Sequence, residues 1–205
     1  MKSEQHLILH GLGIKKYAGA DEVAGIIGLD PTHVAEALRE QVLRGRIVEN
    51  NGKYSMTPTT RVAVTGDYSR HYAEVRHDAA FVQAYEDFER INITLKELIT
   101  NWQVIEVQGT VIPNYHADQD YDGRIIDRLG SLHERADGIL AEFCRRLPRM
   151  QIYRDKLLNA LERAEDGAIE WVSDARLESY HTLWFELHED LLCIMGRVRD
   201  ENRVS

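Results

Sequence analysis

The stretch Arg44–Arg61, RGRIVENNGKYSMTPTTR, gives the clearest structural signal in this chain. Two short apolar runs, Arg46–Glu49 and Lys53–Met56, flank the dipeptide Asn51-Gly52. Asn-Gly between two such runs favours a tight β-hairpin, because both residues tolerate the positive φ angles of that turn. The sequence therefore predicts an antiparallel hairpin over these residues.

Three helices are predicted before the hairpin. A first helix begins at Ser3 and ends near Gly19, and a second, short helix begins around Asp21. The third follows Asp30, a good N-cap, with Pro31 at the first helical position. Three helices followed by a hairpin are the order of a winged helix-turn-helix domain, in which the hairpin is the wing.

The element MTPTTR at residues 56–61 extends this pattern beyond the hairpin. It resembles the "LTPxGR" element that follows the wing in MarR-type and related bacterial regulators, with Thr60 in place of the glycine. The resemblance covers about the first 65 residues. It implies a winged helix-turn-helix domain over residues 1–66 and a function in binding double-stranded operator DNA. The wing is shorter than in MarR-type proteins and lacks their usual Asp-x-Arg element.

Such a domain would place its third helix in the major groove and its wing against the sugar-phosphate backbone or in the minor groove. Glu36 and Glu40 lie on the predicted groove face and would repel phosphates. The alternative is therefore a winged-helix module that contacts another protein. The predicted DNA contacts are Thr32, His33, Arg39, Arg44, Arg46, Lys53 and Arg61.

The charge distribution restricts where DNA could bind. The net charge is −9, but residues 1–66 carry eight basic and seven acidic residues, whereas the remainder carries seventeen and twenty-seven. The acidic remainder should repel nucleic acid, so any DNA contact must come from the first third. The leading hypothesis is a transcriptional regulator, and the rival is an adaptor or accessory subunit that does not bind DNA.

Residues 67–205 are predicted to form an all-α bundle, which makes the chain mainly α with two domains. Apolar residues recur at spacings of three or four, and the segment 104–122 between two such runs is predicted to be a loop with a short hairpin. The bundle is expected to form a homodimer and to bind a small-molecule effector. The predicted helices span residues 78–102, 125–147, 153–164 and 174–198.

Histidines on the predicted bundle helices suggest a polar site. His181 and His188 are two turns apart on one helix face, and His133 borders an apolar stripe on another helix. Imidazoles with nearby carboxylates could hold a divalent metal, and the alternative is hydrogen-bonded core histidines that set the bundle register. The predicted ligand-binding residues are Asn92, Trp102, His133, Tyr180, His181, Trp184 and His188, of which the three histidines are the candidate metal ligands.

Other motifs point to no cofactor or catalytic chemistry. Glu-x-x-His occurs at Glu74–His77 and Glu178–His181, but a di-iron bundle also needs a bridging glutamate on each of two other helices, and the first pair falls at the expected linker, so chance spacing is favoured. The loop 114–122 lacks the glycine and glutamate of an EF-hand and is interpreted as a solvated turn leading into helix caps. No phosphate loop, GxSxG or HExxH motif is present, so an enzyme is not expected.

The apolar run near the N-terminus is too short to span a bilayer and lacks a small-residue cleavage site. The two cysteines lie in helical apolar patterns, without the spacing of a zinc site or disulfide framework. These features predict a cytoplasmic protein with free thiols and no membrane partner.

Overall fold

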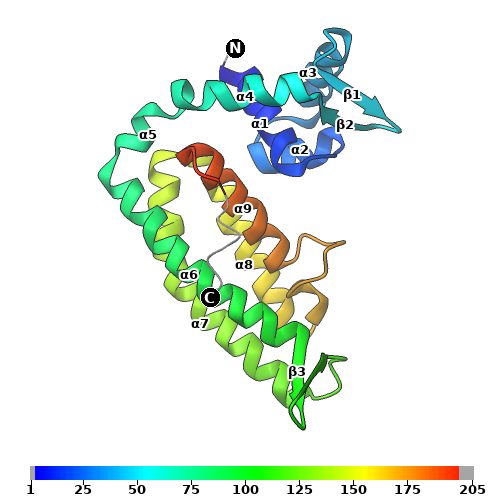
Figure 1. The fold of residues 1–205 in the computed structure, drawn as a ribbon, viewed down its shortest axis with the longest axis vertical. Coiled ribbons are helices and arrows are strands. Elements are labelled where there is room, and N and C mark those ends of the chain that lie inside the picture. The colour runs from blue at the N-terminus through cyan, green and yellow to red at the C-terminus, as the bar shows by residue number, and fades with distance from the viewer. Residues whose placement is uncertain (1–2, 199–205) are drawn as a thin grey trace. The chain divides into compact units, whose positions relative to one another are not determined.

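The computed structural model describes residues 3–198, which are mainly helical (Figure 1). The chain forms two compact units. Of the described residues, the first unit contains 3–78 together with 186–198, and the second contains Ala79–Phe185. This division differs from the predicted boundary after residue 66, because a helix runs through that position and the last part of the chain joins the first unit. None of the described helices is long and apolar enough to cross a membrane.

The first unit begins with the three predicted helices, which the structure confirms. These are α1 (Ser3–Lys15), α2 (Ala20–Ile27) and α3 (Pro31–Leu43). The Asp30 side chain caps α3 by accepting a hydrogen bond from the backbone N–H of His33 at 3.0 Å. Helix α1 ends earlier than predicted, because Lys16 has a positive φ of 65° that is incompatible with a continuing helix.

The predicted hairpin is also present, as β1 (Ile47–Asn50) and β2 (Lys53–Met56). The strands are antiparallel, and both turn residues between them have positive φ angles. Tyr54 on β2 exchanges backbone hydrogen bonds of 2.8 and 3.1 Å with Ala18, which precedes α2. The hairpin is thereby attached to the helices as well as to itself.

The MTPTTR element is the start of a further helix, α4 (Pro58–His71), which the sequence patterns did not reveal. Thr57 caps this helix through a 3.3 Å hydrogen bond from the backbone N–H of Thr60, and Pro58 occupies its first turn. Helix α4 buries Val64 and Tyr68, so it is part of the first unit rather than a linker. The short helix α5 (Ala73–His77) follows.

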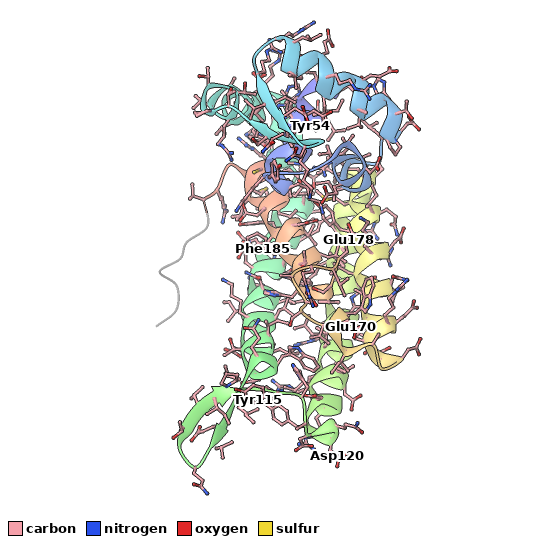
Figure 2. The ribbon with its side chains drawn as sticks, turned by 90° about the vertical axis from the view of Figure 1, so that its right-hand side faces the viewer. Tyr54, Tyr115, Asp120, Glu170, Glu178 and Phe185 are labelled. Atoms are coloured by element: carbon pink, nitrogen blue, oxygen red, sulfur yellow. The ribbon has the colours of Figure 1, made fainter. Side chains whose placement is uncertain are left out.

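The second unit is built around two long antiparallel helices that lie side by side, α6 (Ala79–Gln103) and α7 (Gln119–Arg146) (Figure 1). The hairpin of β3 (Val104–Val107) and β4 (Thr110–Pro113) connects them, as predicted. Figure 2 shows Tyr115 and Asp120 at this end of the unit.

Helix α8 (Gln151–Glu165) packs against α7 in the second unit. The last helix, α9 (Tyr180–Met195), begins later than the predicted residue 174. The preceding residues form turns, in which the Asp174 side chain accepts hydrogen bonds from Arg176. Residues 180–185 of α9 belong to the second unit, and the rest of the helix belongs to the first.

Candidate functional site

Helix α3 exposes the face that the sequence predicted for DNA contact. Val34, Leu38 and Gln41 recur at the helical period, so they lie on one face of α3. This face is buried against the rest of the first unit. The exposed side of the same helix carries Thr32, His33, Glu36, Arg39 and Glu40. The helix therefore presents a polar surface of mixed charge to solvent.

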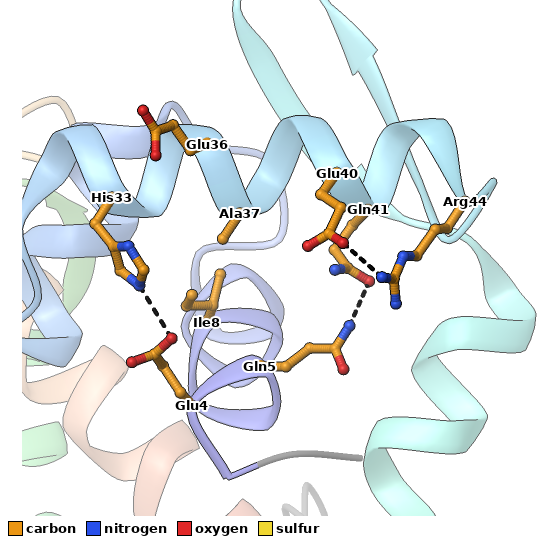
Figure 3. Close-up of a pocket in the computed structure, with 9 residues that line it drawn as sticks. All are labelled: Glu4, Gln5, Ile8, His33, Glu36, Ala37, Glu40, Gln41 and Arg44. Carbon is orange, nitrogen blue, oxygen red and sulfur yellow. Dashed lines mark hydrogen bonds and ion pairs between the residues drawn. The ribbon is translucent and has the colours of Figure 1, made fainter.

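A groove of about 530 Å³ lies along this surface, between α3 and the start of α1 (Figure 3). His33 Nε2 lies 3.0 Å from a Glu4 carboxylate oxygen, and Gln5 donates a 2.8 Å hydrogen bond to Gln41. Three carboxylates line the groove, so its charge does not suit a phosphate group. The lining residues are Glu4, Gln5, Ile8, His33, Glu36, Ala37, Glu40, Gln41 and Arg44.

Most of the predicted DNA-binding cations already have partners. Arg44 pairs with Glu40 at 2.5 Å, and Lys53 pairs with Glu22 at 3.3 Å. These pairs are about half exposed, and such pairs contribute only about 0–1 kcal/mol each, so a phosphate can compete with them.

The other cations near this face are less constrained. Arg46 donates to Gln41 at 3.2 Å. Arg39 and Arg61 form no hydrogen bond or ion pair with the residues that the structure describes, and both are exposed. Arg39 and Arg61 are therefore the side chains best able to bind an added phosphate or base.

Four of the seven predicted ligand-binding residues meet inside the second unit. Trp184 donates from Nε1 to the Asn92 side-chain oxygen at 3.1 Å, and His133 Nδ1 lies 3.2 Å from the Tyr180 hydroxyl. The rings of Tyr180, Trp184 and Phe88 stack in sequence, with centroids 6.0 and 4.7 Å apart. These polar atoms satisfy one another, as expected for core residues that set the register of the helices.

The other three predicted ligand residues lie elsewhere. Trp102 is near the end of α6, and its ring lies against that of His116, with centroids 4.4 Å apart and planes tilted by 36°. His188 belongs to the first unit, while His181 and His133 belong to the second. Seven residues of helix separate His181 from His188 by about 10.5 Å along the axis, which places them in different packing layers. In residues 3–198, the three histidines do not form a group with closely spaced ligand atoms.

The loop before α7 forms a small polar network. Asp118 caps α7 by accepting a hydrogen bond from the Tyr121 N–H at 3.0 Å. Asp122 is buried, which the sequence did not predict, and its two oxygens contact Asn114 and His116 at 3.0 and 3.1 Å. This network holds the loop against Trp102. Among the described residues, it does not form a group of closely spaced potential metal ligands.

The first unit contains a buried polar cluster that sequence reasoning missed. His10 Nδ1 lies 2.7 Å from the Tyr68 hydroxyl, and His10 Nε2 lies 2.9 Å from an oxygen of Asp190. His10 and Asp190 are completely buried. The cluster connects α1, α4 and the last turns of α9, so it explains why the end of α9 belongs to the first unit.

His6 and His71 lie beside this cluster, with ring centroids 4.1 Å apart and nearly parallel planes. Burial, followed by the neighbouring His71 and His10, lowers the pKa of His6 to about 4, so the ring is neutral at pH 7. Among the described residues, His6, Asp67 and His71 are the one group of at least three potential metal ligands within 4.8 Å of one another.

A sequence signal for this group exists in the spacings HLILH and DYSRH, each of which places two ligand-type residues one helical turn apart.

Comparison with known proteins gives no further guide, because no family model, curated protein or solved structure matches the chain.

Proposed function

We propose that this protein is a DNA-binding transcriptional regulator that uses the first unit as a winged helix-turn-helix domain. The observation that carries the proposal is the succession of α2, a three-residue turn, α3 and a hairpin attached to the helices by the Ala18–Tyr54 pairing. The turn is tight because Gly28 adopts the left-handed conformation and Asp30 caps the next helix. In a helix-turn-helix protein the second helix of this pair enters the major groove.

In the proposed complex, Arg39 faces the bases or the nearest phosphate from the middle of α3. Arg46, Lys53 and Arg61 lie on or beside the hairpin and contact the backbone on either side. His33 and Arg44 exchange their exposed glutamate partners for DNA. Thr32, at the N-terminal end of α3, is the polar side chain best placed for a base edge, because recognition helices read DNA with their early residues.

The second unit is proposed to mediate homodimerisation and to bind the effector. A two-fold dimer would place two α3 helices on successive major grooves of a symmetric operator. Exposed apolar side chains suitable for such an interface include Ile93 on α6 and Leu158 on α8, at 58% and 45% exposure. A symmetric operator gives a direct test, because a dimer protects two half-sites one DNA turn apart.

The decisive measurement is binding of the full chain to duplex DNA at several salt concentrations. A phosphate-binding surface gives an affinity that falls steeply with salt, with a slope of about 0.9 for each phosphate contact. Arg39→Ala should weaken binding by about 1–3 kcal/mol if it contacts a base. Arg61→Ala should weaken binding to all sequences alike and reduce the salt slope by about one contact. Arg128→Ala, an exposed arginine on α7, is the matched control and should have no effect.

A second function, docking to a protein partner, is favoured by the acidic groove and by apolar side chains near the hairpin. Leu43, Val48 and Val62 are 89%, 54% and 73% exposed. Large apolar side chains exposed to this degree offer apolar surface that a protein partner could bury. If DNA binding is absent at low salt, or is unchanged in Arg39→Ala and Arg61→Ala, the regulator proposal fails and this adaptor function replaces it.

A further inference from the structure

We propose that His6, Asp67 and His71 form a binding site for one divalent transition-metal ion in the first unit. The site is separate from the α3 surface and does not depend on the proposed function. It also differs from the histidine site predicted in the second unit, since it uses none of the same residues.

The helices bring the three ligands together without any rearrangement of the backbone. Asp67 and His71 are four residues apart on α4, so their side chains lie on one face, one turn apart. His6 reaches the same place from α1, and its ring stacks on His71. Each of the three offers a ligand atom within 4.8 Å of the others. A tetrahedral ion with bonds of 2.0–2.1 Å requires donor atoms about 3.3 Å apart, which side-chain rotations can provide.

The strongest evidence for a bound ligand comes from the ring nitrogens of His6 and His71. Both ring nitrogens of His6 and Nε2 of His71 are buried, and none has a hydrogen-bond partner among the described residues. His6 itself is 1% exposed. Buried polar groups are nearly always paired, because an unpaired one loses its hydration and gains nothing. A coordinated ion would supply the missing partner for one nitrogen of each ring.

Neighbouring groups leave these rings available for metal binding. His10 is the next histidine on α1, but both of its nitrogens are already engaged by Tyr68 and Asp190. His10 therefore serves as packing beside the site rather than as a fourth ligand.

The donor set determines which ions would bind. Two imidazoles and one carboxylate suit Zn²⁺, Co²⁺, Ni²⁺ or Fe²⁺, whereas Mg²⁺ and Ca²⁺ prefer oxygen ligands alone. Asp67 and His71 are only partly buried, so the ion can enter from solvent and retain water as a further ligand. Such a site would fasten α1 to the end of α4.

The experiment titrates the full chain, purified without a metal-affinity resin, with Co²⁺ and follows binding by equilibrium dialysis and visible absorption. The expected result is one Co²⁺ per chain at micromolar concentration, with visible bands of a low-coordinate site, and displacement by Zn²⁺. His71→Ala and Asp67→Ala should each weaken binding at least tenfold. His77→Ala is the matched control, because His77 is exposed and its Nδ1 contacts the Ala73 carbonyl one turn away on α5; this variant should bind Co²⁺ like the unmodified protein.

Circular dichroism of each variant separates lost ligands from lost folding. His71 and Asp67 are partly exposed, so their alanine variants are expected to fold even if His6→Ala does not. Equal binding by the unmodified protein, His71→Ala and Asp67→Ala would overturn the site in favour of adventitious surface binding. Failure of the unmodified protein to bind Co²⁺ or Zn²⁺ stoichiometrically would overturn it as well.

Discussion

Removal of the Tyr68 hydroxyl tests whether the buried cluster stabilises the first unit. We expect Tyr68→Phe to lower the free energy of unfolding of this unit by about 1–3 kcal/mol. The Asp190 carboxylate accepts, so His10 donates to it from Nε2, and in the tautomer that carries its proton on Nε2 the Nδ1 atom accepts from the Tyr68 hydroxyl. Loss of the hydroxyl leaves that buried nitrogen without this donor.

The magnitude follows from the burial of the groups that remain. The side chains of His10 and Asp190 are 0% and 1% exposed, so water cannot readily replace the lost hydroxyl. Phenylalanine keeps the ring, including its edge contact with His6 at a centroid distance of 5.0 Å. The cavity left by one oxygen is small, so the loss of the hydrogen bond should dominate the change.

Denaturant unfolding combined with hydrogen exchange of α1 and α4 peptides measures this loss and assigns it to the first unit. The same substitution in a His10→Leu background provides the control, because leucine needs no hydrogen-bond donor. In that background, the loss in free energy of unfolding caused by Tyr68→Phe should be smaller by at least about 0.5 kcal/mol than in the unmodified chain. This difference is the coupling expected for residues in contact. An equal cost in both backgrounds, or a cost below about 0.5 kcal/mol in the unmodified chain, would refute the reasoning.

Three further predictions concern helix ends and acid sensitivity. Arg76→Ala should lower the stability of the first unit by about 1–3 kcal/mol in denaturant unfolding, because Arg76 donates to the final carbonyls of α9, including Ile194 O at 2.5 Å. Gly196→Ala should lower the free energy of unfolding by about 1–2 kcal/mol in the same assay, because Gly196 has a φ of +65° and an added Cβ would lie 3.0 Å from Arg76. An unchanged unfolding midpoint would contradict this strain. Burial lowers the pKa of His133 below 6.5, so the folded second unit binds fewer protons than the unfolded chain and loses stability as the pH falls through 6.5. His133→Asn should flatten this pH dependence between pH 7 and about 5, as measured by denaturant unfolding at each pH.

Local signals account for what the sequence predicted well. The Asn51-Gly52 turn, the Asp30 cap and the 3.6-residue periodicity of α3 and α6 each depend on a few neighbouring residues, and each appears in the structure. The start of α4 was missed although its signal is also local. Thr57-Pro58 fits a helix N-terminus as well as it fits the end of a strand, so the dipeptide alone does not distinguish the two.

Features that depend on distant residues could not be predicted. The contact between His10 and Asp190 spans 180 positions, and no pattern within either helix indicates it. The same holds for the pairing of Trp184 with Asn92, because the sequence indicated both as ligand-binding residues without showing that they satisfy each other. His6, Asp67 and His71 had the right spacing within α1 and α4, but only the packing of these helices places them together.

The discontinuity of the first unit has a consequence for biosynthesis. The opening segment of the first unit is synthesised before Ala79–Phe185, and Asp190 follows only after them. At about 5–20 residues per second those 107 residues take roughly 5–20 s. During that interval the nascent α1 and α4 lack the carboxylate that engages His10. A premature stop codon within α9 should therefore damage a domain whose own N-terminal coding sequence is intact. Proteolysis of the nascent chain would reveal late protection of α1.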